Sequence, residues 1–194
     1  MADRKTTGYI KHITDQEFIR IREYIEHRIK SPSMKMCLKV MIYLGLGAGD
    51  VNDLKRSNFD KNFLVVNFIR KKTGKPVERK LQNFLSQNLL FYYIKNKHKM
   101  IDGYLFFASY KNQSKNKHIL RNVITAKFSQ IRKDLDLNQV YYVCKDGKPL
   151  YRLSSHTMRH YAIYRYYLAS GKDIKAAQQI IGHSKIETTA KYIY

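Results

Sequence analysis

Apolar residues recur three or four positions apart near the start of the chain, which is the spacing of one helix face. The first such set is Phe18, Ile21, Ile25 and Ile29. Thr14 and Glu17 have the spacing of a capping box, in which each side chain bonds to the other residue's backbone N–H. This pattern predicts an amphipathic helix that starts at Thr14 and extends to about residue 30.

A second helix is predicted to open at Ser31 and Pro32, because proline is tolerated at a first helical position. The sequence that follows, MKMCLKVMIYLGL, is apolar on almost every side, which predicts a helix in the centre of the core. A glycine-rich bend then ends it, at Gly45, Gly47 and Gly49. We expect Asp50 to start a short helix through VNDLK.

Two hairpins are predicted from strand-like composition and turn residues. Residues 63–70, FLVVNFIR, are rich in β-branched and aromatic types, and VERKLQ alternates apolar and charged positions after KKTGKP. These segments predict a hairpin with a basic tip. In VYYVCKDGKPLYR, Asp146 and Gly147 supply the turn of a second hairpin.

The remaining periodic segments predict further helices. They cover about 82–97, 119–135, 155–169, 173–181 and 185 to the end, and the lysine-rich loop KNQSKNKH separates the first two. The expected fold is therefore a mostly helical α+β domain with a small antiparallel sheet. With 194 residues and no composition shift, one domain is expected, preceded by a basic arm over residues 1–12.

The net charge of the chain indicates which kind of partner it binds. The chain has 37 lysines and arginines against 15 aspartates and glutamates, a net charge of +22 spread over most of its length. Such a surface attracts polyanions, so double-stranded DNA is the expected partner.

The two cysteines lack metal-ligand spacing, and neither a spanning segment nor a signal peptide is evident. We expect a cytoplasmic, nucleoid-associated protein with no membrane contact.

Two short segments carry candidate chemistry. In HTMRH, His156 and Arg159 lie one turn apart on a predicted helix, where an imidazole and a guanidinium could hold a phosphate. In IGHSKIETTAKY, Gly182 suits a left-handed helix cap and places His183 in a tight connection. Tyr192 then lies two turns into the last predicted helix.

Together these segments resemble the tyrosine recombinase (phage integrase) family. Its pattern is HxxRH, then LGH, then paired threonines with a tyrosine three residues on, and only Ile181 differs from the usual leucine. KKTGKPVERKL resembles the family's basic hairpin, whose lysine falls at Lys72, and ITDQE resembles the start of its catalytic domain. The resemblance covers nearly the whole chain, with residues 13–194 as the catalytic domain and no N-terminal core-binding domain.

The resemblance implies a transesterification on DNA. Tyr192 would attack the scissile phosphate and form a 3′-phosphotyrosyl link, while Arg159 and His183 stabilise the phosphorane. Lys72 would protonate the leaving 5′-oxygen, and His156 would assist the tyrosine proton. Neither a metal nor another cofactor is expected, and the sequence has no metal-ligand cluster or P-loop. Residues expected to contact DNA are Arg70, Lys71, Lys75 and His160.

One departure concerns the glycine-rich bend, where the family has an arginine in a GLR segment and this chain has Gly47. Loss of one guanidinium should cost several kcal/mol of transition-state stabilisation unless another group substitutes. Arg56 and Arg70 are the candidate substitutes. A cleavage-deficient DNA-binding protein on the same scaffold is therefore an alternative function.

A second departure concerns length. About a dozen residues precede the catalytic-domain start, as expected of a truncated or naturally minimal form that binds DNA more weakly than a two-domain clamp. The resemblance implies a homo-oligomer, a tetramer on DNA, and a prokaryotic, viral or plasmid origin. A different class is also open: KDIKAAQQIIGHSKIETTAKY could form a helix-turn-helix of a DNA-binding regulator, although such a protein has no reason to carry HxxRH.

Overall fold

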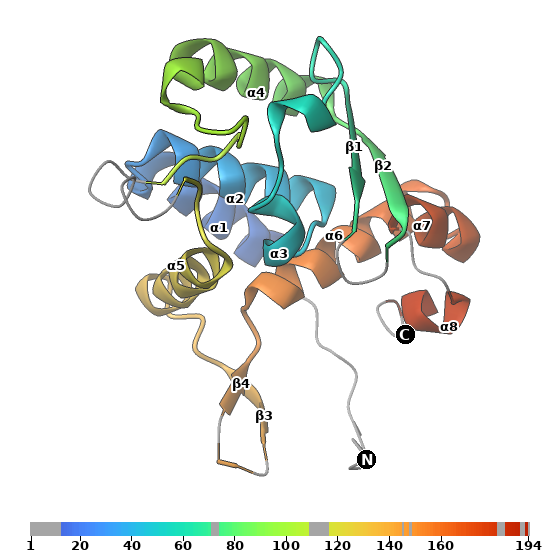
Figure 1. Cartoon of the computed structure of the whole chain (residues 1–194). Coiled ribbons are helices and arrows are strands. Elements are labelled where there is room, and N and C mark those ends of the chain that lie inside the picture. Colours follow the sequence, from blue (N-terminus) through green and yellow to red (C-terminus); the bar gives the residue numbers. More distant parts are fainter. Residues whose placement is uncertain are drawn as a thin grey trace.

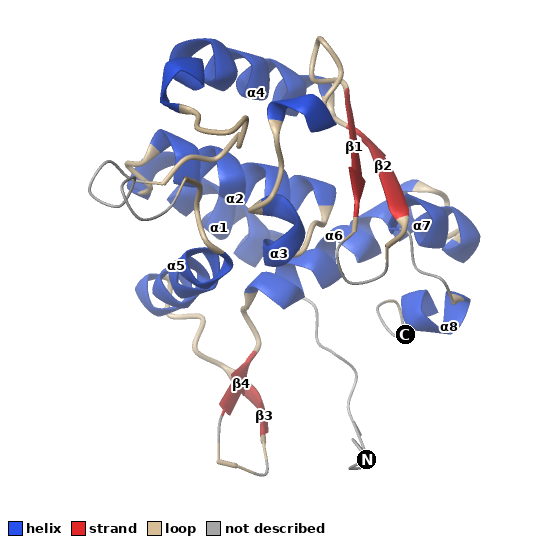
Figure 2. Ribbon diagram, in the orientation of Figure 1, coloured by secondary structure: helices blue, strands red, loops and turns tan. Residues whose placement is uncertain are grey.

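A computed structural model of the chain describes residues 13–70, 74–108, 117–144, 146–147, 149–181, 185–190 and 193. Its fold is mostly helical with two small antiparallel hairpins, as the sequence predicts (Figures 1 and 2). The α-helices are α1 (Asp15–Arg28), α2 (Pro32–Leu44), α3 (Ala48–Val51), α4 (Asn83–Asn96), α5 (Arg121–Asp134), α6 (Ser155–Ala169), α7 (Ile174–Ile181) and α8 (Ile186–Ala190). Two short 3-10 helices are η1 (Arg56–Asn58) and η2 (Lys97–Lys99), and the strands are β1 (Val65–Ile69), β2 (Pro76–Lys80), β3 (Val140–Val143) and β4 (Pro149–Tyr151).

Helix α2 lies in the centre of the molecule and packs against α1, α4 and α6 (Figure 1). Its side chains are buried on almost every side, as the apolar composition predicts. Burial of Leu38, Met41 and Ile42 alone removes three large apolar side chains from water, each worth about 1.5–3 kcal/mol. This helix is therefore the support on which the other elements are placed.

The predicted starts of the first two helices are confirmed. The Thr14 hydroxyl accepts a hydrogen bond from the Glu17 amide at 3.1 Å, and the Thr14 amide donates to the Glu17 carboxylate at 2.6 Å. Ser31 caps α2 by accepting from the Met34 amide at 3.3 Å. These bonds satisfy backbone N–H groups that a helix start leaves without partners.

The predicted start of the short helix after the glycine bend is wrong. The helix α3 begins at Ala48 with Gly47 as its N-cap, so Asp50 lies in its first turn instead of capping it. An acidic side chain in the first turn still interacts favourably with the positive end of the helix dipole. The Asp50 carboxylate is also 3.5 Å from Nε of Arg70, a distant partner that the local pattern does not reveal.

The first strand starts two residues later than predicted, at Val65. The reason is a turn before it, in which Phe63 has a φ of 58°, a left-handed backbone conformation. The Asp60 carboxylate accepts hydrogen bonds from the amides of Val65 at 2.7 Å and Asn62 at 3.3 Å. Phe63 is fully buried by this turn, so its side chain belongs to the core and not to the strand.

Strands β1 and β2 pair as the predicted antiparallel hairpin, shown in Figure 2. Val66 faces Arg79 across the pair, and the side chains of both are buried. Pairing continues past the strand ends, because the Arg70 amide donates to the Lys75 carbonyl at 2.9 Å. The inward face of the hairpin therefore carries two arginines beside its apolar residues.

The second predicted hairpin, β3–β4, projects away from the helices (Figure 1). Elsewhere in the fold, α6 and α7 form a small apolar cluster of Ile163, Tyr167 and Ala177, against which Ile193 packs, and α8 contacts α7. The last described residue is therefore held against its own chain. Among the described residues, no helix is long and apolar enough to cross a membrane.

Candidate functional site

Helix α6 carries the HTMRH segment in its first two turns. Ser154 caps this helix, and its hydroxyl accepts from the Thr157 amide at 3.1 Å. The cap fixes the first turn, because it satisfies a backbone donor that would otherwise lack a partner. It thereby sets the direction in which His156 and Arg159 project.

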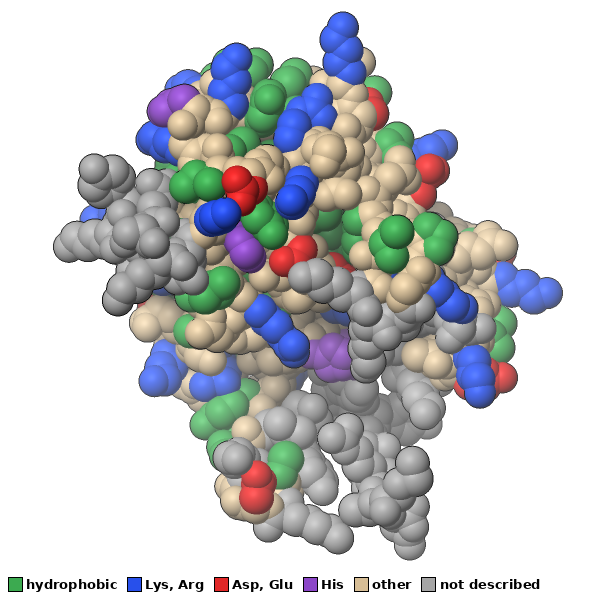
Figure 3. Space-filling model, viewed as in Figure 1, with side chains coloured by type: hydrophobic (Ala, Val, Ile, Leu, Met, Phe, Trp, Pro, Cys, Tyr) green, Lys and Arg blue, Asp and Glu red, His purple; other side chains and the backbone are tan. Residues whose placement is uncertain are grey.

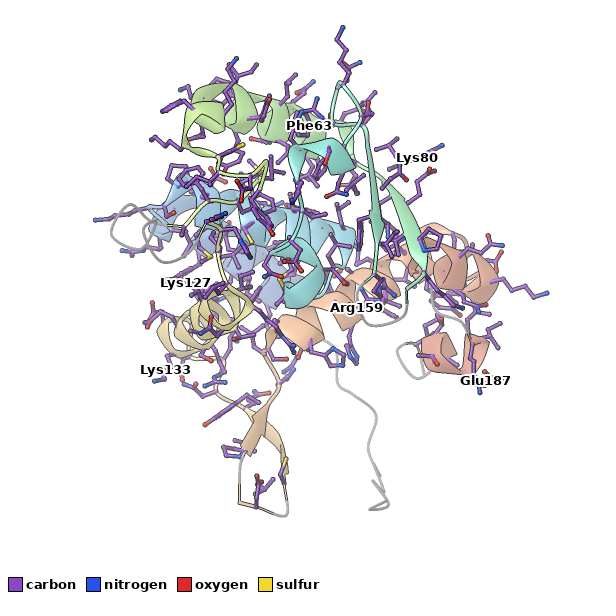
Figure 4. All side chains as sticks on the ribbon, in the orientation of Figure 1. Phe63, Lys80, Lys127, Lys133, Arg159 and Glu187 are labelled. Atoms are coloured by element: carbon purple, nitrogen blue, oxygen red, sulfur yellow. The ribbon has the colours of Figure 1, made fainter. Side chains whose placement is uncertain are left out.

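Arg159 is 8% exposed and lies beside the end of the β1–β2 hairpin, as its label in Figure 4 shows. Its Nη1 donates to the backbone carbonyl of Gly45 at 2.6 Å. Gly45 ends α2 with a φ of +62°, and a Cβ there would lie only 3.0 Å from that of Ala162. The carbonyl thus reaches Arg159 because glycine allows both the left-handed backbone and the close approach of α6.

His156 and His160 lie one turn apart on α6, and their rings meet edge to face with centroids 4.2 Å apart. The His156 side chain is exposed, whereas His160 is 1% exposed. The outer imidazole is therefore exposed to solvent and contacts the edge or face of the inner one. Contact of His160 with DNA stays a prediction.

Four predicted site residues, Lys71, Lys72, His183 and Tyr192, lie outside the described residues. The structure does place the chain on either side of each. The Gly74 amide donates to the Arg70 carbonyl at 2.8 Å at the hairpin end, and Lys75 beside it is exposed. Before Tyr192, Thr189 of α8 is fully buried.

The glycine bend places position 47 next to the hairpin. A Cβ on Gly47 would lie 3.5 Å from Oδ2 of Asp50, the same oxygen that is 3.5 Å from Nε of Arg70. Arg70 is 8% exposed, so it approaches the bend from inside the molecule. Position 47 and Arg70 therefore meet at one carboxylate, although they come from different elements.

Arg56, the other candidate substitute for an arginine at position 47, serves a different region. Its guanidinium donates to the carbonyls of Phe59 at 2.9 Å and Lys61 at 3.2 Å. It also lies over the Phe63 ring, 4.4 Å from the centroid. These contacts hold the turn before β1, so Arg70 is the candidate that lies beside the bend.

Arg79 on β2 belongs to this site but was not predicted from the sequence. It is 5% exposed, and burial, helped by the positive charges of Arg159 and Arg70, lowers the pKa of its guanidinium to about 10. The sequence did contain a signal for its burial, because the alternation in VERKLQ puts Val77 and Arg79 on the same strand face. An arginine on an apolar strand face indicates a buried cation.

The face of the molecule in Figure 3 carries many basic side chains. Lysine and arginine side chains spread over the face in Figure 3, and acidic side chains are fewer on it. A positive potential of this kind concentrates phosphate-bearing ligands near the protein. A buried guanidinium, Arg159, and an exposed imidazole, His156, thus lie one turn apart on α6, and their binding of a phosphodiester stays a prediction.

The model of the phage integrase family matches residues 11–194 of the chain. No curated protein matches it. Solved structures with a similar fold include XerA recombinase, with a TM-score of 0.74 and 20% identity over 100% of this chain and 62% of that one. The XerH site-specific recombinase bound to its palindromic difH substrate has a TM-score of 0.73 and 16% identity, over 94% of this chain and 49% of that one.

A lambda integrase dimer bound to a COC′ core site is also similar, with a TM-score of 0.67 and 16% identity over 97% of this chain and 60% of that one. At these identities the likeness shows a shared fold. The chain spans about half to three-fifths of the length of these three proteins.

Proposed function

Because the chain belongs to the phage integrase family, we propose that it is a site-specific tyrosine recombinase that cleaves and rejoins DNA strands through Tyr192. The observation that supports this most directly is the environment of Arg159. Its guanidinium is buried and fixed by the Gly45 carbonyl, with the exposed imidazole of His156 one turn away. A donor fixed before the substrate arrives stabilises developing negative charge without reorganisation.

In the proposed reaction, the phenolic oxygen of Tyr192 attacks the scissile phosphorus. A bond forms between phosphorus and this oxygen, while the bond from phosphorus to the 5′-oxygen breaks. His156 takes the phenolic proton, and Lys72 gives a proton to the leaving oxygen. Arg159 and His183 stabilise the five-coordinate phosphorane between these steps.

The product is a 3′-phosphotyrosyl link and a free 5′-hydroxyl. A 5′-hydroxyl from another strand reverses the same steps and releases Tyr192, which joins the two strands. The number of phosphodiester bonds is unchanged, so the energy of the broken bond is kept in the covalent intermediate. The chemistry of these residues accounts for each proton without another reagent.

Double-stranded DNA is the proposed substrate. The net charge of +22 supports it, and two of the similar structures are recombinases bound to DNA. We also propose assembly as a homo-oligomer on DNA, because strand exchange needs two cleaved sites at once. The helix-turn-helix alternative concerns only the last segment, whereas the family match extends from residue 11 to residue 194.

Covalent capture tests the proposal without a known target site. The protein is incubated with a pool of nicked duplexes of randomised sequence, and covalent adducts are separated on a denaturing gel. We expect an adduct with the wild type and none with Tyr192→Phe, while both retain binding to DNA. Binding without an adduct in the wild type would instead support the cleavage-deficient alternative.

A further inference from the structure

Three arginine side chains gather, almost fully buried, between the β1–β2 hairpin and α6. They are Arg70, Arg79 and Arg159, which are 8%, 5% and 8% exposed. The positive charges of Arg159 and Arg70 lie close enough to Arg79 to lower its pKa. The Asp50 carboxylate supplies one negative charge to this cluster. Three buried guanidinium groups therefore keep a net positive charge, which is costly unless further negative charge is supplied.

Arg79 is the least satisfied of the three. Its Nη1 donates to the backbone carbonyl of Glu78 at 2.8 Å, and its buried Nε has no hydrogen-bond acceptor among the described residues. By comparison, Arg70 has the Asp50 carboxylate within 3.5 Å and Arg159 has the Gly45 carbonyl. A buried charged donor without an acceptor indicates a position prepared for an anionic ligand.

The fold gives Arg79 a defined direction. It pairs with Val66 in the hairpin and faces inward, toward α6, which carries Arg159 and Tyr166. The Tyr166 hydroxyl donates to the Tyr43 carbonyl at 3.1 Å, so it has an acceptor of its own. At neutral pH Arg79 is charged, because even its lowered pKa is about 10.

We propose that Arg79 is a catalytic residue, whose guanidinium binds a non-bridging oxygen of the scissile phosphate beside Arg159 and supplies the second arginine that Gly47 cannot. The inference rests on the proposed function, since it needs a phosphodiester at Arg159. Arg70 is a positioning residue in this arrangement. It holds Asp50 beside the bend and adds positive charge behind the phosphate.

Position 47 offers a direct test, because its backbone conformation and the space at its Cβ allow a side chain there. Gly47 has a φ of −72°, which any residue adopts, and a Cβ would meet Asp50 Oδ2 at an ordinary 3.5 Å. A new guanidinium at this position would have the Asp50 carboxylate as its neighbour. Gly47→Arg should therefore compensate for a lost Arg79 but not for a lost Arg159.

The experiment measures the rate of covalent adduct formation with a nicked duplex recovered from the randomised pool. Variants are Arg79→Met, Arg79→Met with Gly47→Arg, Arg159→Met with Gly47→Arg, and Lys80→Met. Lys80 is the matched control, because it is the next residue of β2 and is exposed on the opposite face. Thermal unfolding of every variant is measured in parallel.

We expect Arg79→Met to slow adduct formation roughly 100-fold, the effect of removing one preorganised donor. Its Tm should stay the same or rise, because a buried cation is replaced by an apolar side chain of similar length. The double variant Arg79→Met with Gly47→Arg should react at least tenfold faster than Arg79→Met alone. Lys80→Met should keep the wild-type rate. An unchanged rate in Arg79→Met would overturn the proposal. A fall in both rate and Tm that Gly47→Arg cannot reverse would show a structural role and overturn it too.

A second readout separates this inference from the proposed function. Inorganic phosphate is added to the wild type and to Arg79→Met, and the rise in Tm with phosphate concentration is compared. If the wild type forms no adduct but phosphate stabilises it more than Arg79→Met, the anion site stands and the proposed function fails. Equal stabilisation of the two proteins would overturn the anion site itself.

Discussion

Two glycines in the bend after α2 face opposite constraints, although they are two residues apart. Gly45 has a left-handed backbone and touches α6, while Gly47 has an extended backbone with space for a side chain. The carbonyl of Gly45 also accepts from Arg159. Loss of the first glycine should therefore disturb both packing and the site, whereas substitution of the second should disturb neither fold nor backbone.

We expect Gly45→Ala to lower the free energy of unfolding by about 1–3 kcal/mol, because alanine strains the left-handed backbone and crowds Ala162. Gly47→Ala, the matched control, should leave it unchanged within about 0.5 kcal/mol or raise it slightly. Urea unfolding followed by circular dichroism measures both. Equal effects at the two positions would contradict the assigned backbone conformations.

A pH effect is expected at Asp60, whose carboxylate bonds to the amides before β1. The Val65 amide contributes most to holding the pKa of this carboxyl below its usual value, against an opposing effect of burial. A lowered folded pKa stabilises the fold above the unfolded value of about 4 and loses this stabilisation as the pH falls through the folded pKa. Asp60→Asn should therefore be less stable than the wild type at pH 6, and the difference should shrink toward pH 2. Urea unfolding at both pH values measures it, and a constant difference would contradict the charged acceptor.

Among the elements, α1 is joined to the segment before α6 by the carboxylate of Glu17. Oε2 of Glu17 accepts from the Thr14 amide at 2.6 Å and from Nη2 of Arg152 at 2.7 Å. Arg152 lies just before α6, and its Nη1 also donates to Gln139 at 2.8 Å. The cap of the first helix thus helps to fix the segment that leads into the site.

Glu17→Ala should lower the free energy of unfolding by about 1–3 kcal/mol, because it removes a cap partner and an acceptor of the partly buried Arg152. Glu23→Ala on the exposed face of the same helix is the control and should change it by less than about 0.5 kcal/mol. Thermal or urea unfolding measures the difference. Equal values would mean that the cap and the ion pair contribute nothing beyond a surface charge.

The elements that the sequence predicts well are those with local signals. Thr14 and Ser31 as caps, and the turn with Gly147 at a φ of 77°, depend on residues close in the chain, and the structure confirms them. The start of α3 and the left-handed Phe63 were missed. Gly47 caps α3 without a side-chain hydrogen bond, and the Asp60 bonds that shape the turn at Phe63 leave no mark on the hydrophobic pattern.

In the candidate site, local pattern identified the residues of HTMRH but not Arg79. The alternation around Arg79 indicates that it faces inward, yet only the fold brings it near Arg159 of α6. Arg70 was predicted as a DNA contact, and the structure adds its ion pair with Asp50. The arginines come from separate elements and meet only in the tertiary fold. Their spacing along the chain therefore does not predict that they lie close together.

At the scale of the whole molecule, the charge of +22 should dominate binding to DNA of any sequence. The affinity for a random duplex should fall steeply as salt rises from 50 to 200 mM, measured by fluorescence anisotropy. Lys75→Ala, at the hairpin end, should reduce the slope of log affinity against log salt by about one, the value of a single phosphate contact. Lys97→Ala, an exposed lysine of η2 beyond α4, is the control and should leave the slope unchanged. Equal slopes for the two variants would contradict a hairpin that follows the DNA backbone.

The shared carboxylate of Asp50 has a consequence for how such a protein could evolve. Position 47 and Arg70 adjoin the same oxygen, and Arg79 lies on the strand that pairs with the one leading to Arg70. Suppose that an ancestor had one arginine at position 47 and another at position 79. Loss of either arginine would have left the other as a positive charge near Arg159. The bend arginine could therefore be replaced by glycine along a path on which every intermediate keeps a second guanidinium near Arg159.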